Sequence, residues 1–186
     1  LGLEAAGVAM ERGRVVIDNH FATNVPGIYA IGDVVGFPIL AHASLDQSPR
    51  FVESLWGNGV SPSSPTAYGL RTTPQLAMVG ATEEQLRNDL VAYEVGISRF
   101  LDVPHGQFTG KPTPMLKLLF HRETLQILGI HCFGANASEI IHIGQAIMAQ
   151  PIPQNSLMYF INTTFNYPTM AEAYRVAALN GYNRLF

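Results

Sequence analysis

Residues 115–133 read MLKLLFHRETLQILGIHCF, and this stretch decides the fold. Two strand-like apolar runs, Met115–Phe120 and Gln126–Phe133, flank the polar residues His121-Arg122-Glu123-Thr124. Apolar runs on either side of a short polar segment are typical of a β-hairpin. The stretch therefore predicts two adjacent antiparallel strands.

The residues before this hairpin add two more strands and a helix. Gln75–Val79 and Tyr93–Phe100 are both strand-like. Between them, Thr82 is followed three residues later by Gln85, a capping box that predicts a helix N-terminus.

The residues after the hairpin indicate helices. Asn136-Ala137-Ser138-Glu139 resembles the first capping signal and is expected to begin a helix with Asn136 as its cap. The apolar stripe of this helix is Ile140, Ile143 and Ile147. Asn155–Asn162 and Thr169–Leu179 are two further predicted helices. Strands followed by helices favour the α+β class with an antiparallel sheet.

The N-terminal third predicts shorter elements, followed by a linker. Arg14–Ile17 predicts a short strand, and Ile28–Ile31, apolar throughout, predicts a strand buried on both faces. Ala41–Trp56 predicts a helix that Pro49 kinks or breaks. Gly57–Pro65 is rich in Gly, Asn, Ser and Pro and predicts a linker. We therefore expect an α/β piece at 1–60, a linker at 61–69 and a second domain at 70–186.

Composition narrows the class of protein. The 186 residues are 47% hydrophobic and 13% charged, as expected of a globular chain with a large core and not of a disordered one. The net charge of −3, with scattered basic residues, argues against a nucleic-acid partner. No apolar stretch is long enough to span a membrane, and the single cysteine, Cys132, allows no internal disulfide. A cytoplasmic location is expected.

Gly32-Asp33 is the sharpest feature of the N-terminal third. It follows the apolar run, where a glycine permits close approach of a ligand and a carboxylate can bind polyol hydroxyls. Taken alone, the dipeptide is more simply a turn. Its context, Thr23 to Val34 (TNVPGIYAIGDV), closely resembles the second flavin-binding motif of the two-dinucleotide-domain flavoprotein reductases, the family of dihydrolipoamide dehydrogenase and glutathione reductase.

This resemblance implies a cofactor, FAD, and a site at Gly32, Asp33, Ala41 and His42. In the family, the aspartate that matches Asp33 binds the flavin ribitol, and the pair that matches Ala41-His42 lies beside the isoalloxazine ring, mostly through backbone groups. Thr73 to Gly80 (TPQLAMVG), with Thr82-Glu83, resembles the start of the family's C-terminal dimerisation (interface) domain. The resemblance therefore implies a homodimer, or a higher homo-oligomer, formed through 70–186.

Within the family, several segments resemble the transhydrogenase branch, in which NADPH reduces the flavin and the flavin reduces NAD+. These segments are Lys117–Thr124, Ile130–Gly134, Glu139–Met148 and Phe160–Arg175. The chain contains no Gly-x-Gly-x-x-Gly, so the sites for the flavin pyrophosphate and for NAD and NADP are expected upstream. We expect the chain by itself to be a C-terminal piece that neither holds FAD tightly nor transfers hydride, and that folds from about residue 67 onward.

Residues 167–172, called the tail below, distinguish disulfide reduction from hydride transfer between nicotinamides. Disulfide reductases of the family carry His-Pro-Thr-x-x-Glu here, and that histidine is the acid–base for a thiol. This chain has Tyr167-Pro168-Thr169 and Glu172 instead. Because phenols ordinarily titrate near about pH 10, a tyrosine is a poor proton shuttle at neutral pH. The tail favours hydride transfer, which needs no such base, and offers no confident catalytic residue. A disulfide reductase and a stand-alone dimerisation module remain the alternatives.

The histidines show no spacing typical of a metal site, and no metal is expected. They are His20, His42, His105, His121, His131 and His142. Cys132 lies in an apolar strand and is expected to be a small buried hydrophobe.

Overall fold

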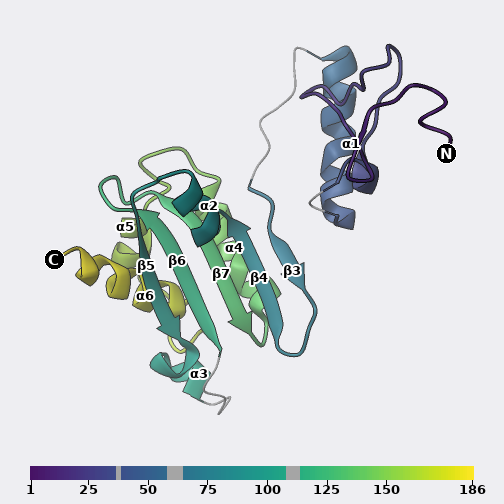
Figure 1. The fold of residues 1–186 in the computed structure, drawn as a ribbon. Coiled ribbons are helices and arrows are strands. Elements are labelled where there is room, and N and C mark those ends of the chain that lie inside the picture. The colour runs from purple at the N-terminus through teal and green to yellow at the C-terminus, as the bar shows by residue number, and fades with distance from the viewer. Residues whose placement is uncertain (37–38, 58–64, 108–113) are drawn as a thin grey trace. The chain divides into compact units, whose positions relative to one another are not determined.

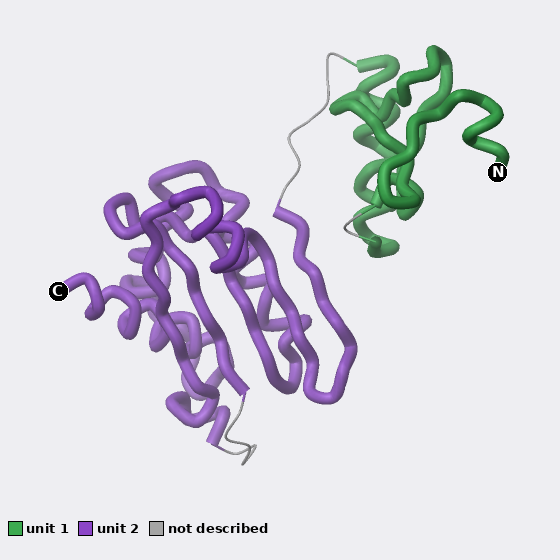
Figure 2. Tube along the Cα trace, viewed as in Figure 1, with its two compact units in different colours: residues 1–63 green, residues 64–186 purple. Residues whose placement is uncertain are grey.

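The computed structural model describes residues 1–36, 39–57, 65–107 and 114–186. The chain divides into two compact units, Leu1–Ser63 and Ser64–Phe186 (Figure 1, Figure 2). The first four residues of the predicted linker 61–69, residues 61–64, lie outside the described residues. Its last two residues, Tyr68 and Gly69, belong to a strand, because they pair in register with Met78 and Ala77.

Unit 2 is built on a five-stranded antiparallel sheet with the strand order β3-β4-β7-β6-β5. The predicted hairpin is confirmed: β6 and β7 are adjacent, and Lys117 pairs with His131 at its middle. The strands are β3 (Tyr68–Leu70), β4 (Gln75–Gly80), β5 (Tyr93–Arg99), β6 (Met115–His121) and β7 (Ile127–Gly134). The predicted α+β class with an antiparallel sheet is therefore correct.

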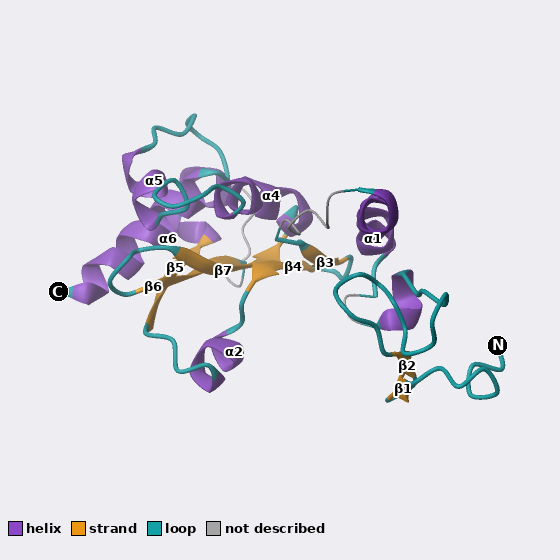
Figure 3. Ribbon diagram, turned by 90° about the horizontal axis from the view of Figure 1, so that it is seen from above, coloured by secondary structure: helices purple, strands orange, loops and turns teal. Residues whose placement is uncertain are grey.

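Three helices cover one face of this sheet, and the core lies between the two layers (Figure 3). They are α4 (Ala137–Met148), α5 (Leu157–Asn162) and α6 (Glu172–Tyr182). α4 packs on β4 and β7, and α6 packs on β5 and β6. Leu116, Leu118 and Phe120, alternate residues of β6, are fully buried. The period of two thus buries one set of side chains beneath the helices.

The opposite face of the sheet carries α2 (Glu83–Asn88) (Figure 3). Its predicted capping box is present: Thr82 Oγ1 accepts from the Gln85 amide at 3.2 Å, and Gln85 Oε1 accepts from the Thr82 amide at 2.8 Å. Glu83 reaches the sheet, where its Oε1 lies 2.7 Å from Lys117 Nζ. This ion pair fixes α2 against β6.

The prediction for the start of α4 was wrong in one respect. Asn136 occupies the N-cap position, but its side chain makes no capping hydrogen bond. Its backbone is left-handed, with φ 60° and ψ 19°, whereas a capping side chain normally projects from an extended residue. The amide of Ser138 donates instead to Gln75 Oε1 at 3.2 Å, so a residue of β4 caps the helix.

The last two helices are shifted from their predicted bounds. α5 begins at Leu157, capped by the Ser156 side chain. α6 begins at Glu172 and not at Thr169, because residues 169–174 are joined by hydrogen bonds spanning three residues, tighter than those of an α-helix.

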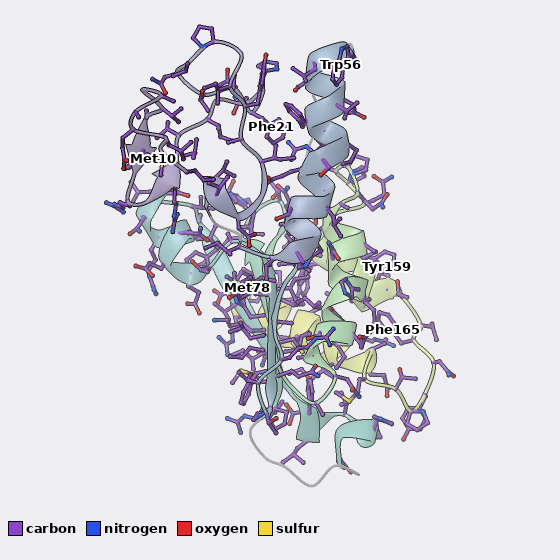
Figure 4. All side chains as sticks on the ribbon, turned by 90° about the vertical axis from the view of Figure 1, so that its right-hand side faces the viewer. Met10, Phe21, Trp56, Met78, Tyr159 and Phe165 are labelled. Atoms are coloured by element: carbon purple, nitrogen blue, oxygen red, sulfur yellow. The ribbon has the colours of Figure 1, made fainter. Side chains whose placement is uncertain are left out.

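Unit 1 contains a two-stranded ribbon, β1 (Met10–Glu11) with β2 (Arg14–Val15), then η1 (Gly32–Val35) and α1 (Ala41–Trp56). α1 is the predicted helix and includes Pro49. Phe51 of α1 packs edge-on against Phe21 with 6.1 Å between ring centroids, and Trp56, at the end of the helix, is 77% exposed (Figure 4).

The predicted buried strand at Ile28–Ile31 is not formed. Tyr29 makes a single isolated bridge to Ala22, and the Tyr29 side chain is exposed. Within the described part of unit 1 no strand lies on either side of this run to complete a sheet. The strand predicted at Arg14–Ile17 is likewise shortened to Arg14–Val15.

Candidate functional site

Gly32 and Asp33 form the first half of η1, and side chains of α1 hold both residues. The Gly32 amide donates to Gln47 Oε1 at 2.6 Å, and Ser44 Oγ donates to Asp33 Oδ1 at 3.1 Å. Gly32 has φ +82°, a conformation that other residues rarely adopt. Asp33 is exposed. The carboxylate is thus held on one oxygen and open to solvent, a geometry suited to accepting hydrogen bonds from hydroxyl groups.

The structure brings the other two predicted flavin-site residues close to this loop. Ala41 and His42 are the first two residues of α1, and Ser44, which bonds to Asp33, belongs to the same turn. The N-cap residue, Leu40, is extended and makes no side-chain capping bond. The positive end of a 16-residue helix therefore lies beside the Asp33 carboxylate.

Ser44 and Gln47 were missed by the sequence reasoning. Their spacing of three places them on the same face of α1, and this is the only sequence signal that they carry. Nothing in the sequence indicates that this face meets the Gly32-Asp33 loop, because the contact spans 11 to 15 residues.

In unit 2, the tail residues Tyr167 and Glu172 are not joined to each other. Tyr167 is 67% exposed. Glu172 is the first residue of α6, and its Oε2 atom is buried without a hydrogen-bond partner among the described residues.

A cavity of about 390 Å³ lies next to the tail, at one end of the sheet. Met170 lines it from the tail, Phe100 from the residue directly after β5, and Phe133 from the end of β7. The polar residues Thr73, Gln75, His105 and Asn136 also line it. These residues come from five separate segments, so the sequence alone gave no indication of the cavity.

Burial also shifts the pKa values of two residues of β7, His131 and Cys132. His131 Nε2 lies 3.1 Å from the carbonyl oxygen of Ala81, and burial lowers the pKa of its imidazole. Burial raises the pKa of the Cys132 thiol to about 12, as expected of a buried small hydrophobe. Among the residues that the structure describes, no cluster of histidine, cysteine and carboxylate side chains could hold a metal ion. No helix in that same part of the chain has the length and apolar character needed to cross a membrane.

Two family models match the chain. Residues 1–48 match the model described as pyridine nucleotide-disulphide oxidoreductase, and residues 66–178 match the model of that family's dimerisation domain.

Curated relatives match over the whole chain. Soluble pyridine nucleotide transhydrogenases of Pseudomonas entomophila and Pseudomonas putida are each 53% identical over 190 residues, which cover 100% of this chain and 40% of the relative. The chain thus spans less than half the length of the relatives that it matches.

Two solved structures share the fold. The flavoprotein disulfide reductase RclA of Escherichia coli superposes with a TM-score of 0.80 at 27% identity, covering 96% of this chain and 41% of that one. LpdA of Mycobacterium tuberculosis superposes with a TM-score of 0.81 at 26% identity, covering 100% of this chain and 40% of that one. The chain therefore belongs to the pyridine nucleotide-disulphide oxidoreductase family, and its residues 66–178 are the dimerisation domain of that family.

Proposed function

We propose that this chain is the C-terminal, subunit-pairing part of a soluble, FAD-dependent NAD(P)+ transhydrogenase that moves hydride from NADPH through the flavin to NAD+. The observation that carries the proposal is the 53% identity over the whole chain to relatives of that name. We further propose that residues 1–60 belong to the nucleotide-binding part and that residues 61–69 link it to the dimerisation domain. Residues 70–186 then pair two subunits in a cytoplasmic homodimer.

The residues proposed to hold FAD fit that cofactor. Asp33 is exposed and keeps one carboxylate oxygen, Oδ2, without a hydrogen bond among the described residues, as binding a ribityl hydroxyl requires. Ala41 and His42 supply backbone amides of the first turn of α1. A bound flavin would accept hydride from one nicotinamide and donate it to another. This chain's own contribution would be to bind and orient the flavin.

The tail supports hydride transfer over disulfide reduction. Tyr167 and Glu172 make no hydrogen bond to each other, and Tyr167 stands where the family's disulfide reductases have a histidine. The resemblance to the disulfide reductase RclA favours the second candidate, a dithiol-linked flavoprotein. Hydride transfer between nicotinamide and flavin needs no thiol base, so the tyrosine is compatible with the first candidate and not with the second.

The experiment that tests this function uses the Pseudomonas putida relative with this chain in place of its matching 40%. We expect the purified chimera to retain FAD and to reduce thio-NAD+ with NADPH. We expect it not to reduce lipoamide or glutathione disulfide. The unaltered relative is the control for both reactions. Retained FAD with disulfide turnover and no transhydrogenation would identify the second candidate as the function.

Subunit pairing is tested on the chain itself. We expect size-exclusion chromatography with light scattering to give a dimer without absorbance in the flavin bands. A monomer at micromolar concentration would contradict the pairing role, and a yellow peak would contradict our expectation that this chain holds only one edge of the flavin site.

A further inference from the structure

We propose that Ser44 and Gln47 are positioning residues for the flavin site, and that they hold the Gly32-Asp33 loop so that Asp33 meets the ribityl chain. The inference rests on the proposed function, because it takes Asp33 to be the group that contacts the ribityl hydroxyls. It concerns residues of α1 to which neither the family pattern nor the relatives' names give a role.

Ser44 orients the Asp33 carboxylate. Its hydroxyl lies 3.1 Å from Asp33 Oδ1 and 3.3 Å from the carbonyl oxygen of Leu40, so its single proton has two acceptors. A carboxylate is the stronger acceptor of the two. When that proton is given to Oδ1, the carboxylate loses rotational freedom, and Oδ2 remains for a ligand hydroxyl.

Gln47 holds the backbone of Gly32, the residue before Asp33. Its Oε1 accepts from the Gly32 amide at 2.6 Å, one helical turn beyond Ser44. Gly32 is left-handed at φ +82°, and a Cβ atom there would lie 3.5 Å from Ser44 Oγ. The loop is thus held at two consecutive residues, through one backbone bond and one side-chain bond.

Both bonds come from one face of the helix whose first turn supplies Ala41 and His42. α1 therefore sets the distance between the carboxylate and the amides of its own N-terminus. A site that is already in its binding geometry loses less conformational freedom when the ligand enters, and binding is correspondingly tighter. Removing either bond should weaken flavin binding without removing a ligand contact.

The test measures FAD dissociation constants by flavin fluorescence in the chimera described above. Ser44→Ala and Gln47→Ala should each raise the constant about 3- to 10-fold, and Ser44→Thr, which keeps the hydroxyl, should restore it. The matched control is Ser48→Ala: Ser48 lies one turn further along α1, and among the described residues its hydroxyl donates only to the Ser44 carbonyl oxygen, at 3.3 Å. This control should leave the constant unchanged.

FAD analogues that each lack one ribityl hydroxyl separate positioning from general loss of structure. The effect of Ser44→Ala should disappear with the analogue that lacks the hydroxyl bound by Asp33. An equal effect with every analogue would overturn the inference. Loss of FAD binding in Asp33→Ala but not in Ser44→Ala or Gln47→Ala would also overturn it while leaving the proposed flavin site standing. No effect of Asp33→Ala would overturn the proposed site and the inference together.

Hydrogen exchange of the Gly32 amide, followed by mass spectrometry in the FAD-free chimera, provides a readout without cofactor. The amide should be protected, and Gln47→Ala should accelerate its exchange about tenfold or more, whereas Ser48→Ala should not. An amide that exchanges at the same rate in the Gln47→Ala variant would overturn the role of Gln47.

Discussion

The hydroxyl of Tyr174 bridges two backbone groups of α4, the amide of Gly144 and the carbonyl of Ile140. It accepts from the Gly144 amide at 3.1 Å and donates to the Ile140 carbonyl oxygen at 2.8 Å, the two groups that a regular α-helix would join directly. Tyr174 is fully buried, and burial raises the pKa of its phenol. A side chain of α6 is therefore part of the hydrogen-bond ladder of α4.

Replacing Tyr174 by phenylalanine should destabilise unit 2. The Gly144 amide and the Ile140 carbonyl would lose the hydrogen bonds of the buried Tyr174 hydroxyl, which costs about 1–3 kcal/mol of unfolding free energy. Urea unfolding followed by circular dichroism measures the loss. Tyr182→Phe is the matched control, since the Tyr182 ring packs on Phe186 and its hydroxyl makes no hydrogen bond within the described residues. Equal midpoints for the two variants would contradict the role given to Tyr174.

Replacing Gly96 by alanine should prevent α6 from seating on β5. A Cβ atom at Gly96 would lie only 2.1 Å from the carbonyl oxygen of Ala177, a backbone atom that cannot move aside. Overpacking of this kind costs about 1–3 kcal/mol. Gly69→Ala in β3 is the control, because the nearest atom there is a serine hydroxyl at 3.3 Å. The thermal midpoint of Gly96→Ala should fall well below that of Gly69→Ala. The reverse order would show that β5 and α6 pack less closely at Gly96 than the structure indicates.

His131 should make the stability of unit 2 depend on pH. Burial is the main cause that lowers the pKa of its imidazole below the ordinary 6.5. The unfolded chain therefore binds a proton more readily than the folded one, so stability is full above about pH 7 and falls as the pH drops through 6.5 toward the folded pKa. Urea midpoints at pH 8 and pH 5.5 measure the loss. His131→Gln should remove much of it, whereas His142→Gln, at an exposed position, should not.

Cys132 should be chemically inert in the folded chain. Burial raises the pKa of its thiol to about 12, and the thiolate is the reactive form. Reaction with Ellman's reagent at pH 8 should proceed no faster than unfolding. It should become fast in about 6 M urea, which unfolds an ordinary domain. Immediate reaction under native conditions would mean that β7 is less protected than its burial indicates.

The fold of unit 2 could be predicted because its signals are local. The strand at Gln75–Val79, the Thr82 capping box and the hairpin at 115–133 each depend on neighbouring residues, and all three are present in the structure. The predictions that were wrong depended on distant partners. Asn136 did not supply the cap of α4, because Gln75, 61 residues earlier, reaches that helix.

The candidate site was predictable only in part. Gly32, Asp33, Ala41 and His42 were found through a resemblance and not through their chemistry, and their role in binding flavin stays a prediction. Ser44 and Gln47 carry no signal beyond their spacing of three, because a serine and a glutamine on a helix are ordinary surface residues. The same limit explains Ile28–Ile31: an apolar run indicates burial but does not say which segments of the protein cover it.

The bond from the Ile97 amide to Asn180 Oδ1 joins residues 83 positions apart and ties the edge strand β5 to the last helix. During synthesis, β5 leaves the ribosome long before α6 exists, so the Ile97 amide on its outer edge lacks this partner until residue 180 has been translated. An uncovered strand edge readily pairs with another chain. Nascent chains of this protein should therefore depend on chaperones most in the interval between the completion of the hairpin and the release of α6.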